Sequence, residues 1–179
     1  MELDPVDKIT AGTVGEPGQR TFFLQMRSED RLVTITVEKE QVELLSSSIL
    51  EILATVDLET GDGPPEDQLE LETPIEPLWR AGRLSIGYSE ERDQMLLELE
   101  ELVPESDEEQ SDEEEAAVDA PEPARLRVWA TREQMLALSR HGAAVAARGR
   151  PRCQFCGNPL DPEGHMCPAM NGHRSPSGA

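Results

Sequence analysis

Three cysteines near the end of the chain have the spacing of a zinc-binding site. Two residues separate Cys153 from Cys156, and Gly157 follows, a pattern that lets two thiolates bind one ion while backbone N–H groups point back at the sulfurs. Ten residues separate Cys156 from Cys167, and the chain contains no other cysteine. Three clustered cysteines cannot form a disulfide framework, so metal ligation in a reducing compartment accounts for them better.

A histidine is expected to supply the fourth ligand. In a zinc ribbon the second half would repeat the first, which would place this ligand at position 170, but Met170 is a poor zinc ligand. We favour His173, because it leaves the geometry of the second half relaxed, and His165 is the alternative. Either one gives a Cys3His site with no position open to water or substrate. The sequence therefore predicts a structural zinc ion rather than a catalytic one.

Five arginines surround the cysteines. Arg140 and Arg148 belong to the expected helix before them, Arg150 and Arg152 lead into them, and Arg174 follows them. Guanidinium groups suit phosphate or carboxylate, and a zinc module would give them a rigid mount for a partner. The alternative is that these cations only complement the dipole at the end of the helix.

No group of residues is typical of a catalytic site. Residues 12–18 are glycine-rich, but they lead into an expected strand rather than a helix, which argues against a phosphate-binding loop. Carboxylates are too numerous for any pair to indicate acid–base catalysis. His141 lies on an expected helix without a partner nucleophile, and we interpret it as a surface or partly buried histidine. We therefore expect a protein that is not an enzyme.

The net charge of −21 over 179 residues is large and uneven. Residues 1–124 carry 34 acidic and 8 basic side chains, whereas residues 125–179 carry 3 acidic and 8 basic ones. Such acidity repels phosphate, which argues against a nucleic-acid or anionic-membrane binder. The N-terminus lacks the pattern of a signal peptide, and no apolar run approaches the roughly 20 residues that span a bilayer. We expect a cytoplasmic protein.

Apolar periodicity predicts five strands and two helices. Strands are expected over residues 21–27, 32–37, 78–88, 94–103 and 126–130, and amphipathic helices over 39–56 and 132–148. Thr131 and Gln134 form a capping box at the start of the second helix. The predicted fold class is α+β, with an antiparallel sheet of about five strands, two helices on one face and a C-terminal zinc knuckle.

Composition divides the chain further. We expect a flexible arm at residues 1–20, the α+β domain at 21–149, a zinc-binding arm at 150–174 and a tail at 175–179. Within the domain, residues 60–77 are expected to be a linker and 104–123 a disordered acidic insertion. The insertion either solubilises the protein or masks the arginines. Residues 37–42 and 130–135 both join a strand to a helix through a Glu-Gln pair, which suggests a ββα duplication.

Three segments carry a resemblance. They are GEPGQR at residues 15–20, the WRAG…IGY strand at 79–88 and, most specifically, CQFCGNPLDPEGHMCPAMNGHR at 153–174. Together they resemble an uncharacterised, mainly actinobacterial family of domains of unknown function, sometimes labelled a repeat protein. The resemblance covers nearly the whole chain and implies no established activity, substrate or partner.

The favoured function is a non-enzymatic interaction or adaptor protein that presents the zinc-stapled arm to a protein partner. One alternative is a small-molecule-binding protein or enzyme with a pocket near Trp79, Arg80 and Tyr88 at the sheet. A deep pocket lined by Arg20, Arg80 and His141 would favour that alternative. Another is a nucleic-acid-binding regulator that uses the basic zinc arm, which the net charge disfavours.

Overall fold

A computed structural model describes residues 1–56, 58–103, 122–148, 153–158 and 167–170, and the fold is α+β. Its elements in chain order are β1 (Glu2–Leu3), β2 (Lys8–Val14), β3 (Thr21–Ser28), β4 (Arg31–Val37), α1 (Lys39–Val56), the 3-10 helix η1 (Glu66–Leu69), β5 (Pro77–Ser89), β6 (Gln94–Glu101), β7 (Arg125–Thr131), α2 (Arg132–Ala147) and the 3-10 helix η2 (Pro168–Met170). Neither α1 nor α2 is both long and apolar enough to cross a membrane.

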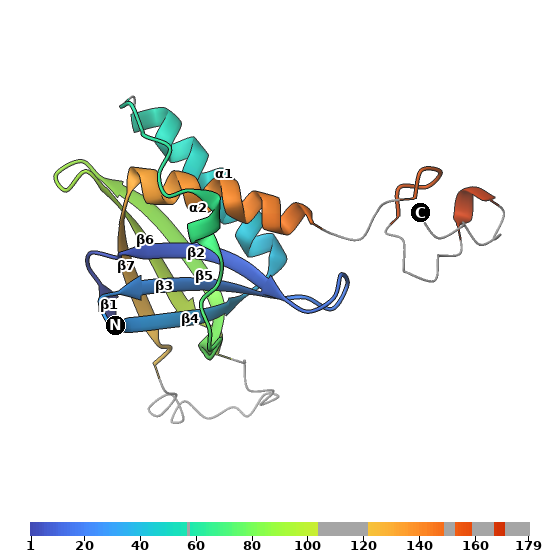
Figure 1. The fold of residues 1–179 in the computed structure, drawn as a ribbon, viewed down its shortest axis with the longest axis horizontal. Helices are drawn as coiled ribbons and strands as arrows, with labels where there is room; N and C mark the ends of the chain where they lie inside the picture. The colour runs from blue at the N-terminus through green and yellow to red at the C-terminus, as the bar shows by residue number, and fades with distance from the viewer. Residues whose placement is uncertain (57, 104–121, 149–152, 159–166, 171–179) are drawn as a thin grey trace, which may run out of the picture.

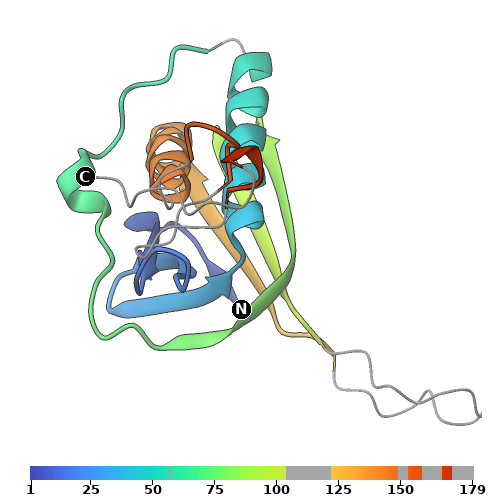
Figure 2. The same ribbon diagram turned by 90° about the vertical axis from the view of Figure 1, so that its right-hand side faces the viewer.

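The sheet is larger than expected and is mixed. Its seven strands follow the order β1-β7-β6-β5-β4-β3-β2, whereas the sequence predicts about five antiparallel strands. The pairs β1–β7 and β4–β5 are parallel, and the other pairs are antiparallel. The edge strands β1 and β2 are consecutive in the chain, so the sheet curls until its edges approach each other (Figure 2). The segment between β1 and β2 forms hydrogen bonds with strands on both sides. Val6 N–H donates to the Trp129 carbonyl of β7 (3.2 Å), and Asp7 N–H donates to the Arg27 carbonyl of β3 (2.8 Å).

Residues 1–20 are not the arm that the sequence predicts. They form β1, β2 and the turn into β3, and Ile9 and Ala11 of β2 are each only 1% exposed. The turn contains Gly15 and Gly18 at φ of 108° and 99°, a backbone region that favours glycine. In the sequence these turn glycines are typical of a flexible segment, which is why β2 before them was not predicted.

The core lies between the sheet and the two helices, which cover the same side of it (Figure 1). Alternate strand residues point at the helices, as a half-buried sheet requires. The largest fully buried apolar side chains are Ile9, Leu24, Met26, Ile35, Ile49, Met95, Leu97, Leu99, Leu126, Met135 and Leu138. Where α1 meets α2, Gly142 permits close approach, since a Cβ there would lie 2.9 Å from Ser46 Oγ. The Ser139 hydroxyl also donates to the Ser46 carbonyl at 2.6 Å.

The two helices begin in the same way. Gln134 Oε1 accepts from Thr131 N–H (2.9 Å), while the Thr131 hydroxyl accepts from Gln134 N–H, which completes the predicted capping box. Gln41 Oε1 likewise accepts from Glu38 N–H at the start of α1 (2.8 Å). The amide group of each glutamine also donates hydrogen bonds to a neighbouring chain segment. Gln41 donates to the carbonyls of residues 81 and 82, and Gln134 to those of residues 6 and 7.

The strand pairings repeat along with the caps. In each half a hairpin (β3–β4 or β6–β7) leads into a helix, and the last hairpin strand pairs in parallel with a segment from the other half (β5 or β1). The duplication stays a prediction, and these paired features support it.

We expect Gln134→Leu and Gln41→Leu each to lower the free energy of unfolding by about 1–2 kcal/mol. Each change removes the bond to the N–H of the residue that precedes the helix and leaves two backbone carbonyls without their amide donor. Chemical denaturation measures the loss, and Gln68→Leu at an exposed position of η1 is the control, with a change below about 0.5 kcal/mol. A loss at only one of the two glutamines would contradict their equivalence.

The segment expected as a linker is packed onto the domain, and we call residues 58–76 the strap. It leaves α1, passes α2 and runs round the outer side of β2 to reach β5 (Figure 2). Leu69 of η1 is 3% exposed, and its carbonyl accepts from the Thr10 hydroxyl of β2. A Cβ on Gly12 would collide with Leu71, so the strap covers the face of β2 that is opposite the helices.

A buried glutamine pairs with the strap as a strand would. Gln25 of β3 is 1% exposed, its Oε1 accepts from Glu72 N–H (2.7 Å), and its Nε2 donates to the Glu72 carbonyl (3.0 Å). Lys8 Nζ donates to the Glu70 carbonyl (2.6 Å), and Arg27 forms an ion pair with the Glu72 carboxylate. The strap therefore covers the face of this half of the sheet that is opposite the helices, held by side chains of β2 and β3 that bond to its backbone.

Candidate metal centre

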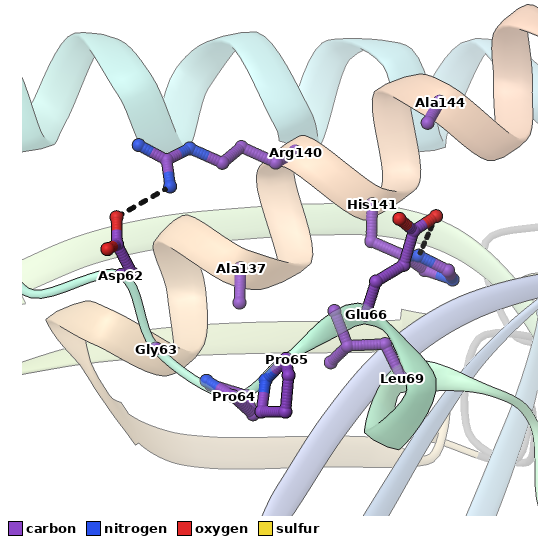
Figure 3. A pocket seen from close by; sticks show the side chains of 10 residues that line it. All are labelled: Asp62, Gly63, Pro64, Pro65, Glu66, Leu69, Ala137, Arg140, His141 and Ala144. Atoms are coloured by element: carbon purple, nitrogen blue, oxygen red, sulfur yellow. Dashed lines mark hydrogen bonds and ion pairs between the residues drawn. The ribbon is translucent and has the colours of Figure 1, made fainter.

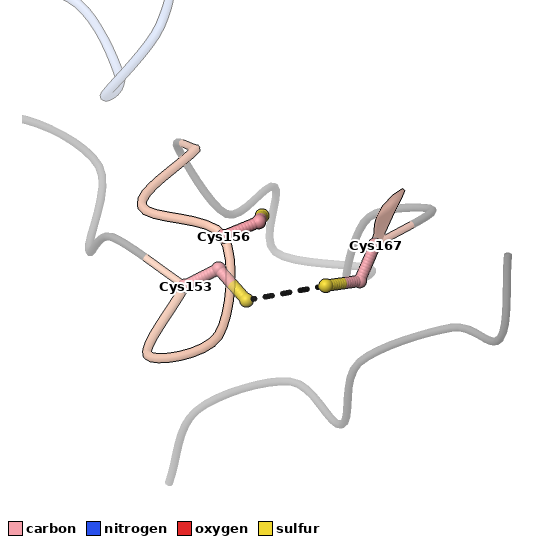
Figure 4. Close-up of side chains that lie close together, drawn as sticks. All are labelled: Cys153, Cys156 and Cys167. Carbon is pink, nitrogen blue, oxygen red and sulfur yellow. Dashed lines mark hydrogen bonds between the residues drawn. The ribbon is translucent and has the colours of Figure 1, made fainter. Parts of the chain in front are cut away.

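The first two cysteines lie in a tight turn (Figure 4). Cys153 N–H donates to the Asn158 carbonyl (2.8 Å), and Gly157 N–H donates to the Cys153 carbonyl (2.9 Å). Gly157 has a φ of 73°, a left-handed conformation that glycine adopts without steric cost. The segment around Cys153 and Cys156 therefore folds locally, and this locality is why its spacing alone predicts a metal-binding turn.

The third cysteine closes a group of sulfurs. The Sγ atoms of Cys153, Cys156 and Cys167 lie within 4.8 Å of one another, and those of Cys153 and Cys167 are 3.8 Å apart. That separation is far longer than the roughly 2.05 Å of a disulfide. A tetrahedral ion with metal–sulfur bonds of about 2.3 Å holds its sulfurs about 3.8 Å apart. Three thiolates in this arrangement could hold one metal ion.

The surroundings of the sulfurs affect their protonation. Cys153 and Cys167 are 4% and 0% exposed, and Cys156 is half-buried. Burial raises the pKa of the Cys156 thiol, the backbone N–H of Asn158 lowers it, and the neighbouring thiols of Cys167 and Cys153 raise it. A bound divalent cation would be the largest local charge and would favour the thiolates, so binding would release protons.

The two candidates for the fourth ligand are histidines. His165 and His173 both lie outside the residues that the structure describes. The structure thus brings together the three predicted cysteines, and the choice between the two histidines stays open.

A family model matches residues 1–167 of the chain, and its description is a protein of unknown function, DUF3090. This chain belongs to the DUF3090 family. The predicted membership of an uncharacterised family is confirmed, and the matched part contains all three cysteines and His165. No curated protein and no solved structure matches the chain. Because the DUF3090 description gives no activity, function has to be argued from the site.

The structure describes two of the five arginines that the sequence singles out. Arg140 forms an ion pair with Asp62 (3.3 Å) and Arg148 with Glu66 (3.2 Å), both in the strap. Arg20 donates to the Arg148 carbonyl. Positions 150, 152 and 174 lie outside the described residues. In this DUF3090 chain Arg140 and Arg148 therefore already have acidic partners.

A cavity of about 380 Å³ lies between the strap and α2 (Figure 3). His141 lines it and is buried at 9% exposed, whereas the sequence predicts a surface or partly buried histidine. Arg20 and Arg80 are not among its lining residues, and Arg80 instead pairs with Glu38 at 3.2 Å. Sequence reasoning placed a possible pocket near Trp79, Arg80 and Tyr88 and missed this one in the DUF3090 chain, because its outer wall exists only once the strap folds back.

Proposed function

We propose that this DUF3090 protein is a non-enzymatic interaction protein whose C-terminal arm is folded by one structural zinc ion. The observation that carries the proposal is the cluster of three sulfurs within 4.8 Å of one another. Soft thiolates favour zinc over the hard cations magnesium and calcium. A histidine completes a closed Cys3His set, so the ion holds the chain rather than activating water. The reduced thiols fit the reducing cytoplasm.

The arm is then the surface offered to a protein partner. Arg150 and Arg152 precede the first cysteine and Arg174 follows the last, so a folded zinc module would carry them close together. The rest of the chain is strongly acidic, which disfavours nucleic acid and leaves an acidic or phosphorylated protein surface as the partner.

Metal analysis of the full chain tests the zinc site. Protein purified under reducing conditions is expected to contain one zinc ion per chain, and His173→Ala is expected to weaken zinc binding at least about tenfold more than His165→Ala. Cobalt substitution should give the absorption spectrum of a tetrahedral thiolate site. Absence of metal, or a bound water on the ion, would refute the structural site, and the reverse order of the histidines would make His165 the ligand.

Affinity purification with quantitative mass spectrometry tests the interaction. A stoichiometric protein partner should be retained by the zinc-loaded chain and lost when Arg150 and Arg152 are both changed to Glu. Arg83→Glu, at an exposed position of β5, is the matched control and should keep the partner. Equal retention by all variants would show that the arm does not form the interface.

A further inference from the structure

The cavity between the strap and α2 has the features of a ligand site. Its volume of about 380 Å³ lies within the range of small-molecule pockets. One wall is a single face of α2, formed by residues 137, 140, 141 and 144, and the other is residues 62–66 and 69 of the strap. Pro64, Pro65, Leu69 and two alanines make most of the lining apolar, while Glu66 and His141 meet at one end (Figure 3).

A buried nitrogen on this wall has no hydrogen-bond partner. His141 is 9% exposed, and its Nδ1 accepts or donates no hydrogen bond, the only such buried side-chain atom in the described part of the chain. The backbone of Ala11 in β2 raises the pKa of His141, as a carbonyl that accepts from the imidazole does, against the larger effect of burial. A neutral imidazole has one N–H and one acceptor nitrogen, so an N–H directed at the Ala11 carbonyl would leave Nδ1 as the acceptor. Burial also lowers the pKa of His141, which keeps the ring neutral.

A second acceptor faces the first. Glu66 Oε1 lies 4.0 Å from His141 Nδ1, too far for a direct bond, and the oxygen also pairs with Arg148. Nδ1 has almost no accessible surface, but the Glu66 side chain that faces it is 71% exposed and can turn, so that one donor atom would lie about 2.8 Å from both acceptors. The gap therefore suits a group with several N–H bonds.

The charges around the cavity select against anions. The strap contains seven acidic residues and no lysine or arginine. The arginine that lines the cavity, Arg140, is paired with Asp62, and Arg148 nearby is paired with Glu66. An entering carboxylate or phosphate would have to displace these pairs and would face the acidic strap, whereas a cation would be attracted by it.

We propose that this cavity binds a small primary amine with an apolar body, whose ammonium group donates to His141 Nδ1 and to the Glu66 carboxylate. The apolar part lies against Leu69, Pro65 and Ala137. This site is independent of the zinc ion, because every residue in it belongs to α2 or the strap.

Three probes of similar shape test the proposal by titration calorimetry on the full chain. Phenethylamine supplies the ammonium group, 2-phenylethanol a neutral donor and 3-phenylpropionate an anion. We expect the amine to bind, the alcohol to bind at least tenfold more weakly and the anion not to bind. The ring ¹⁵N resonance of His141 Nδ1 should shift on binding the amine. Equal binding of the three probes, or no binding of the amine at millimolar concentration, would overturn the proposal.

Two variants and one control locate the site. Glu66→Gln keeps the shape of the side chain but removes its charge, and we expect it to weaken binding of the amine at least tenfold. Ala144→Leu fills the cavity from the exposed side of α2 with a good helix former and should abolish binding while the protein stays folded. Asp67→Asn makes the same charge change at an exposed strap residue outside the lining and should bind as the unmodified chain does. Unchanged binding in Glu66→Gln or in Ala144→Leu would place the amine elsewhere and refute the site.

Discussion

Cys167→Ser is expected to weaken zinc binding by about a hundredfold or more. Structural zinc sites bind with about 10–16 kcal/mol shared among four ligands, so losing one thiolate costs on the order of 3 kcal/mol. Cys167 is 0% exposed and its sulfur lies 3.8 Å from that of Cys153, so a hydroxyl in its place would leave the proposed zinc ion with two thiolates and one imidazole. Competition with a chelator of known affinity measures the change.

The rest of the protein should be unaffected by this substitution. No residue of the described arm belongs to the hydrophobic core cluster, which ends at Ala146. We therefore expect the melting temperature of the sheet domain to stay the same while proteolysis at the arm becomes faster. Met170→Ser is the control, because it changes a sulfur side chain nearby in the sequence whose thioether is a poor zinc ligand. Melting of the whole chain in Cys167→Ser would show that the arm is part of the domain.

Gln25→Leu is expected to lower the free energy of unfolding by about 2–4 kcal/mol. The substitution keeps the approximate volume but leaves the Glu72 N–H and carbonyl, and the Thr34 hydroxyl, without the amide that now bonds to them. Unsatisfied groups at a buried contact cost about 1–3 kcal/mol each, less where water can reach them. Urea denaturation measures the loss, with Gln68→Leu on η1 as the matched change at an exposed glutamine. A similar small loss in both variants would mean that the strap does not stabilise the sheet.

Acid should also weaken the contact between the strap and the sheet. Hydrogen bonds from Arg27 lower the pKa of Glu72 in the folded protein, and the charge of Lys8 lowers it further against the opposing effect of burial. A carboxyl group with a lowered folded pKa stabilises the fold fully above its unfolded pKa and loses that contribution as the pH falls through the folded pKa. Removing the Glu72 charge by Glu72→Gln should therefore reduce the part of the acid dependence of stability that lies below the ordinary pKa of glutamate.

The elements with strong local signals were predicted closely. The bounds of α1 coincide with the predicted helix, and α2 ends one residue before its predicted end. In both cases an amphipathic period and the residues that cap the first turn lie within one segment. The elements that were missed depend on distant partners. Glu2 of β1 pairs with Arg127, and the first 20 residues resemble an arm until that partner is present.

The sequence by itself determined the cysteine cluster, through the cysteine spacing, and the α+β class, through the apolar periodicity, because both are properties of short segments. Only the tertiary structure decided that β1 pairs in parallel with β7, that the strap covers β2 and that His141 faces Glu66 across a cavity. Each of these depends on residues between 59 and 125 positions apart in the chain. Such contacts form when the whole core collapses, and no local sequence pattern predicts them.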